Sequence, residues 1–254
     1  MKKLIIPLVI VLLSGLIILN YLAYQSPTIK KMISQQTIYQ TKENELSIAL
    51  YSNHKGPYQR IDAIESTYLS GDGKRLEVLL VEINKGAKYS YLGETFTQYH
   101  YLFNLPLLKD YYYIKEASLE IRLKNGKEMT FHIGSFDYYY QENERLYLKE
   151  LHATKHEDAF QINEVTMKFD LTEKIFIHEL ILSSHLSISV GEEVDEGVVV
   201  SIPKQPYIID KIALVIRYEK EGLMYEEVLP FYLFFDSIEN VLDYGYLNHV
   251  YVLD

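Results

Sequence analysis

The first 24 residues constrain this chain most, because they contain an uninterrupted apolar run. Met1-Lys2-Lys3 precedes a segment from residue 4 to residue 24 that carries no charged side chain. As a helix, about 21 residues reach roughly 31 Å, which is enough to cross the hydrocarbon core of a bilayer. We therefore expect a single transmembrane helix at residues 1–24 that contacts the lipid bilayer through residues 4–24.

A cleaved signal peptide is the alternative interpretation of this segment. Signal peptides have an apolar core of about 7–15 residues, followed by small residues at the cleavage site. The best site here is Tyr-Leu-Ala at residues 21–23, which places a bulky side chain at the outer of the two small-residue positions. The length of the run and this poor site favour an uncleaved signal anchor.

The flanking charges indicate how such an anchor would be oriented. Lys2, Lys3 and the α-amino group favour a cytoplasmic N-terminus, although Lys30 and Lys31 follow the other end of the segment. We expect a single-pass protein of the cell membrane with an extracytoplasmic C-terminal body. About three residues would remain in the cytoplasm, too few to fold or to catalyse a reaction.

Composition excludes several functions for the remaining chain. The net charge is −10, and without Lys2 and Lys3 the chain holds 23 basic and 35 acidic side chains, a net charge of −12. Such a surface repels phosphate backbones, so we expect no nucleic-acid partner. The absence of cysteine excludes disulfides, thiol nucleophiles and thiolate metal sites, and an extracytoplasmic protein without disulfides is typical of a bacterial envelope.

The patterning after the anchor predicts an all-β fold. Residues 25–44 are polar and are interpreted as a stalk or linker, with a short helix as the alternative. From residue 45 onward, apolar residues alternate with period two and are rich in Tyr, Ile, Val, Thr and Phe, which favours strands. We expect antiparallel β-sandwich architecture, with tandem sandwich-like units at residues 45–135 and 136–254; a single larger sandwich is the alternative. Strands are predicted at residues 46–51, 61–69, 76–83, 94–103, 117–123, 127–133, 145–150, 160–169, 174–182, 186–190, 198–202, 208–218, 223–235 and 246–253.

One hairpin is specific enough to predict its register. A two-residue turn at Asn125-Gly126 would place the apolar rows of the two strands on opposite faces. A three-residue loop at residues 124–126 instead pairs Ile121 with Met129, so that both rows share a face. We therefore predict a type I turn, a G1 bulge and Gly126 in the left-handed region.

Few residues suggest chemistry. His152 and His156 are candidate metal ligands, but they converge on one ion only if their segment is helical, so we expect no metal and no cofactor. Two tyrosine triplets stand out among 24 tyrosines, and exposed tyrosines frequently anchor interfaces. The interaction candidates are Tyr111, Tyr112, Tyr113, Tyr138, Tyr139 and Tyr140.

The sequence favours a binding protein over an enzyme. No nucleophile elbow, zinc-protease motif, P-loop or dinucleotide fingerprint occurs, and the catalytic residues of any activity are unknown. We expect a non-catalytic binding or accessory protein that contacts another membrane or envelope protein. The alternative is an envelope hydrolase that acts on glycan or peptide, because paired carboxylates cannot be excluded by composition.

Overall fold

The computed structural model of this chain describes residues 29–140, 146–155, 162–183, 186–203, 208–209, 211–212, 214–229, 232–233, 241–243 and 245–253. Within these residues, regular structure is almost entirely β-strand, and helix is limited to three-residue 3-10 turns. The chain is all-β, which confirms the class that its alternating pattern predicts. None of the described residues belongs to a helix long and apolar enough to cross a membrane, and the predicted span at residues 4–24 lies outside them.

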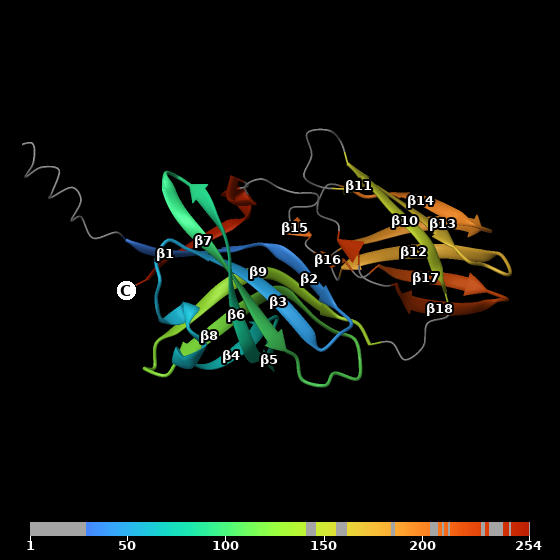
Figure 1. The fold of residues 1–254 in the computed structure, drawn as a ribbon. Coiled ribbons are helices and arrows are strands. Elements are labelled where there is room, and N and C mark those ends of the chain that lie inside the picture. The colour runs from blue at the N-terminus through green and yellow to red at the C-terminus, as the bar shows by residue number, and fades with distance from the viewer. Residues whose placement is uncertain are drawn as a thin grey trace, which may run out of the picture. The chain divides into compact units, whose positions relative to one another are not determined.

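Two sheets are built mainly from the first part of the chain, coloured blue to green in Figure 1. The first contains, in spatial order, β20 (Asn248–Leu253), β1 (Lys30–Gln35), β3 (Glu45–Ser52), β7 (Glu94–Asn104) and β6 (Leu79–Tyr91). The second contains, in spatial order, β15 (Ile208–Ile209), β2 (Thr37–Thr41), β9 (Glu128–Tyr138), β8 (Tyr112–Leu123), β4 (Ile64–Gly71) and β5 (Lys74–Glu77). The last described strand, β20, therefore lies beside the first described strand, β1.

Aromatic side chains connect these two sheets. The ring of Phe131 in β9 packs edge-on against Tyr251 of β20, with centroids 5.0 Å apart, and against Tyr58, with centroids 6.2 Å apart. Tyr58 belongs to the 3-10 turn η1 (Pro57–Gln59), and its carbonyl accepts a 2.8 Å hydrogen bond from the hydroxyl of Tyr101 in β7. Phe131 and Tyr101 are fully buried, so the two sheets enclose a shared core.

Later strands form two further sheets with a core of their own. One contains β10 (Leu148–Lys155), β11 (Ile162–Phe169) and β14 (Gly197–Ser201). The other contains β13 (Leu186–Val194), β12 (Ile175–Ser183), β17 (Val215–Lys220) and β18 (Leu223–Val228). Val165, Met167, Ile177 and Ile216 lie at the centre of this core. A two-residue pair joins β16 (Lys211–Ile212) to β19 (Tyr232–Leu233).

The pairing is not wholly antiparallel. Strand β2 runs parallel to β9, with Thr37 opposite Gly134, and parallel to β15, with Thr37 opposite Ile208. The predicted antiparallel pairing therefore does not hold for β2.

Residues 30–41 form β1 and β2, so the prediction of a stalk over residues 25–44 is wrong for this part. Ile33 is fully buried, and so is the polar side chain of Ser34, whose hydroxyl donates a 2.5 Å hydrogen bond to the carbonyl of His132. Because a distant strand supplies this acceptor, a polar segment forms a buried strand although its composition is typical of a linker.

The register predicted for the β8–β9 hairpin is confirmed. Ile121 lies opposite Met129, and Gly126 has a φ of +83°. The amide of Gly126 donates to the carbonyl of Leu123, and the amide of Leu123 donates to the carbonyl of Lys127. These are the hydrogen bonds that a three-residue loop with a glycine bulge requires.

Candidate functional site

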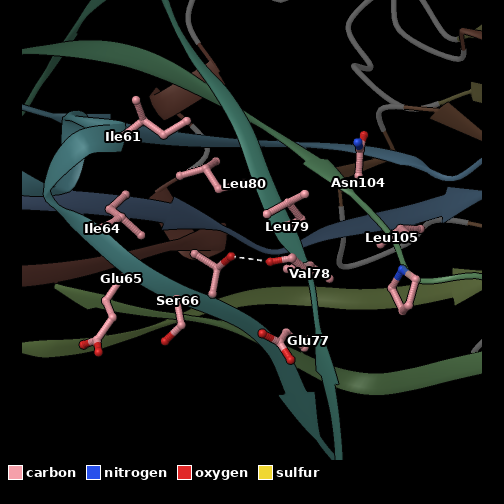
Figure 2. A pocket seen from close by; sticks show the side chains of 12 residues that line it. Ile61, Ile64, Glu65, Ser66, Glu77, Val78, Leu79, Leu80, Asn104 and Leu105 are labelled. Atoms are coloured by element: carbon pink, nitrogen blue, oxygen red, sulfur yellow. Dashed lines mark hydrogen bonds between the residues drawn. The ribbon is translucent and has the colours of Figure 1, made fainter. Parts of the chain in front are cut away.

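A cavity opens where strands β4 and β6 separate, as Figure 2 shows. Strand β5 pairs with β4 from Tyr68 to Gly71. Val78 is the residue that follows β5, and its backbone amide still donates to the carbonyl of Thr67 in β4 at 3.1 Å. From Leu79 onward the chain pairs with β7 in the other sheet. The chain thus changes sheets at Val78, and the space between the diverging strands is called the β4–β6 wedge below.

The wedge is mainly apolar. Its volume is about 520 Å³. Its lining residues are Ile61, Ile64, Glu65, Ser66, Thr67, Glu77, Val78, Leu79, Leu80, Asn104, Leu105 and Pro106. Leu79 is 67% exposed and Ile61 is 46% exposed, and Val81, two residues further along β6, is also largely exposed. Large apolar side chains gathered at an open cavity are typical of a binding surface.

Two carboxylates give the wedge a negative rim. Glu65 forms an ion pair with Arg122, with 3.4 Å between its Oε2 and the arginine Nε, and both side chains are more than half exposed. Such a pair is weak in water. Glu77 has no ion pair among the described residues. The wedge is therefore suited to a ligand that is apolar and carries positive charge.

Both strands that border the wedge have an open edge. Among the strands that the structure describes, β6 is the outermost of its sheet. On the wedge side of β4, strand β5 begins pairing only at Tyr68, so residues 64–66 lack a strand partner there within the described part of the chain. Open edges offer backbone N–H and C=O groups to an incoming extended segment.

The structure brings the two predicted tyrosine triplets together where β8 begins and β9 ends. Tyr112 lies directly opposite Tyr138. The ring of Tyr111 stacks on Tyr113 and on Tyr139, with centroids 5.4 and 5.0 Å apart. Tyr138 and Tyr139 are buried, so they contribute to packing rather than to an exposed surface. Tyr111 and Tyr140 are partly exposed, at 45% and 43%, and a role of this cluster in interactions stays a prediction.

A buried carboxylate fixes the tyrosine cluster. The hydroxyl of Tyr111 donates a 2.8 Å hydrogen bond to Oδ1 of Asp137, which is fully buried. Burial, followed by the charge of Asp137, raises the pKa of Tyr111 far above its usual range, and the same two causes raise the pKa of Tyr139. The Lys74 ammonium lies 3.6 Å from the ring centroid of Tyr113, in a cation–π contact.

Of the two predicted histidine candidates, the structure describes only His152. His152 is exposed on β10, and its Nε2 lies 3.5 Å from Oε2 of Glu150. Glu150 also pairs with Lys168 at 2.8 Å, and this hydrogen bond is the main reason that the pKa of Glu150 is lowered. His156 lies outside the described residues. Over the described ranges, no group of three or more histidine or acidic side chains is placed to hold a metal ion.

Sequence reasoning missed the wedge. Residues 76–83 were expected to form one strand, whereas the structure divides them between β5 and β6 in different sheets. A signal was present, because four consecutive apolar residues at 78–81 break the alternation. Successive side chains in a strand point to opposite faces, so a run of four apolar residues places apolar side chains on both faces of the strand.

Comparisons with known proteins give no family. The sequence matches no protein family, and no curated protein matches it significantly. Among solved structures, it is similar to fibronectin(III)-like modules of CbhA from Clostridium thermocellum, at 6% identity and a TM-score of 0.22, covering 80% of this chain and 89% of that chain. It is also similar to the YadV chaperone, at 10% identity and a TM-score of 0.22, covering 78% and 99% respectively. At this TM-score we infer nothing from either likeness.

Proposed function

We propose that this chain is a membrane-anchored, extracytoplasmic, non-catalytic binding or accessory protein of a bacterial cell envelope. In this proposal, residues 4–24 hold it in the membrane with the N-terminus in the cytoplasm. Two sandwich-like units form the body outside, and another membrane or envelope protein is the partner. The apolar, acid-rimmed β4–β6 wedge is the observation that carries the proposed binding role.

The wedge fits an extended peptide segment of the partner. Its open edges on β4 and β6 can pair with a strand, and its apolar lining can accept every second side chain of that strand. Covering the exposed part of a side chain such as Leu79 contributes about 1 kcal/mol. Glu77 and Glu65 favour a basic residue near the apolar ones. We therefore expect a segment in which apolar and basic residues alternate.

The test uses the full-length chain in detergent and a library of peptides that varies apolar and charged positions. The wild-type chain is expected to select alternating apolar and basic residues. Leu79→Asp should abolish this selection, because it places a charge in the wedge. Leu92→Asp is the matched control, since Leu92 is 84% exposed and lies between β6 and β7, outside the wedge lining. Glu77→Lys should shift the selection toward acidic residues.

Three results would count against the proposal. Selection that survives Leu79→Asp would place binding elsewhere. Cleavage of the selected peptides would indicate a hydrolase. Protection of the body from protease added to intact cells would contradict the extracytoplasmic location.

A further inference from the structure

Two imidazoles from opposite ends of the described chain lie side by side. His132 belongs to β9 and His249 to β20, and their ring centroids are 5.5 Å apart with the planes inclined at 55°. His132 is exposed and His249 is half-buried, so a solute can reach them from the surface. Neither histidine is among the residues that line the wedge.

The separation of the rings matches shared coordination of one metal ion. A zinc–nitrogen bond of about 2.0–2.1 Å and a tetrahedral angle place the centroids of two imidazoles about 5 Å apart. The observed 5.5 Å is close enough that a side-chain adjustment of a few tenths of an ångström suffices.

One ring nitrogen of His132 already has a hydrogen-bond partner. Its Nδ1 lies 2.9 Å from the hydroxyl oxygen of Ser118, a buried residue directly opposite it on β8. When Nδ1–H donates to this oxygen, the lone pair remains on Nε2. Metal-binding histidines commonly have such a partner on the second nitrogen, because it fixes both the tautomer and the ring orientation.

His249 has a comparable partner. Its Nε2 lies 3.1 Å from the side-chain nitrogen of Gln36, the residue that joins β1 to β2. Turning the Gln36 amide by a half-rotation presents its oxygen to Nε2–H, which leaves the lone pair of His249 on Nδ1. Strand β20 is held in place by other hydrogen bonds. The backbone N–H of Gln36 donates to the carbonyl of Leu247 at 3.0 Å, and the side-chain amide of Gln35 donates to Oδ1 of Asn248 at 2.8 Å.

We propose that His132 and His249 together bind one divalent transition-metal ion, with water completing its coordination. Imidazole suits Zn²⁺, Ni²⁺ and Cu²⁺, and the chain has no thiolate to compete for them. The ion ties β20 to β9, so it acts as a clamp on the last strand of the described fold. Two protein ligands give moderate affinity and leave coordination positions open.

The test is a titration of the full-length chain with Zn²⁺ in detergent, after purification without a polyhistidine tag and removal of metal with a chelator. We expect one zinc ion per chain. His132→Gln and His249→Gln should each weaken binding by at least about tenfold. At ten times the wild-type Kd, zinc should raise the Tm of the wild-type chain by about 3–5 °C and that of His132→Gln by no more than about 1 °C.

A double variant, His152→Gln with His156→Gln, is the matched control and should retain both the affinity and the Tm shift. Loss of zinc binding in this control would assign the metal to that segment and overturn the proposal. Unchanged affinity in His132→Gln, or no saturable binding in the millimolar range, would also overturn it. Because His132 is exposed, its glutamine variant should fold normally, and far-UV circular dichroism checks this.

Discussion

Thr67 in β4 and Val78, the residue between β5 and β6, are joined by two hydrogen bonds at the narrow end of the wedge. The amide of Val78 donates to the carbonyl of Thr67 at 3.1 Å, and the hydroxyl of Thr67 donates to the carbonyl of Val78. Both residues are only 2% exposed. Backbone groups that are leaving one sheet for another lack ladder partners, so a side-chain donor at this point satisfies a buried carbonyl.

Replacing Thr67 by valine is expected to lower the free energy of unfolding by about 1–2 kcal/mol. The substitution keeps the shape of the side chain but removes the donor to the buried carbonyl of Val78. Urea denaturation of the full-length chain, followed by circular dichroism, measures the effect. Thr130→Val on β9 is the control, because Thr130 is exposed, and it should change the midpoint little. Equal effects of the two variants would contradict this account of Thr67.

Replacing Tyr111 by phenylalanine is expected to destabilise the fold by about 1–2 kcal/mol. The variant keeps the ring stacked on Tyr113 and Tyr139 but removes the hydroxyl that donates to buried Asp137. Hydrogen bonds to charged groups contribute more than neutral ones, and the partial exposure of Tyr111 reduces the cost. Thermal unfolding measures the change. Tyr147→Phe, at a residue that is 68% exposed, should have a Tm within experimental error of the wild type.

Local patterns predicted those parts of the fold that depend on neighbouring segments. The β8–β9 register follows from two apolar rows and one glycine, because only the pairing of Ile121 with Met129 buries both rows on one face. The same register places Tyr112 opposite Tyr138, which explains why the two tyrosine triplets meet. The all-β class was predictable because the alternation of apolar and polar residues is a property of each segment alone.

Long-range partners decided the parts that the sequence did not predict. Ser34 can be buried in a strand because its hydroxyl donates a hydrogen bond to the carbonyl of His132. These two residues are 98 positions apart in the sequence. The wedge arises because β5 and β6 belong to different sheets, which depends on how β4 and β7 are placed. The approach of His132 to His249 requires the last strand to return beside β1, and no local pattern encodes that return.

The stability of the fold is expected to fall in mild acid partly through Glu94. Hydrogen bonds from Lys31 and then Asn53 lower the pKa of this carboxyl below its ordinary value of 4.5. A pKa lowered in the folded state contributes stability above about pH 4.5, and that contribution is lost as the pH falls through the folded-state pKa. The side chains of Lys31 and Glu94 are both partly exposed. We therefore expect their interaction to contribute no more than about 0.5–1 kcal/mol to the free energy of unfolding.

Denaturant unfolding of Glu94→Gln across pH 3 to 7 checks this expectation. The variant should be less stable than the wild type at neutral pH, and the difference should shrink as the pH falls. Glu65→Gln removes a carboxylate whose ion pair is exposed, and its difference from the wild type should stay small at every pH. If the stability difference between Glu94→Gln and the wild type became larger as the pH fell, the prediction would be wrong.

Two glycines with positive φ are expected to respond very differently to alanine. Gly134 has a φ of +110°, and a Cβ there would lie 2.2 Å from the Thr37 carbonyl oxygen and 2.5 Å from the Thr37 nitrogen. Gly126 has a φ of +83° and nothing within 4 Å of a Cβ. Both variants carry the conformational cost of a left-handed alanine, about 1–2 kcal/mol, but only Gly134→Ala also forces β2 away from β9. We expect a loss of about 1 kcal/mol for Gly126→Ala and of about 3–5 kcal/mol for Gly134→Ala in urea denaturation. Similar losses for the two variants would show that the close approach of β2 to β9 at Thr37 is not needed for the fold.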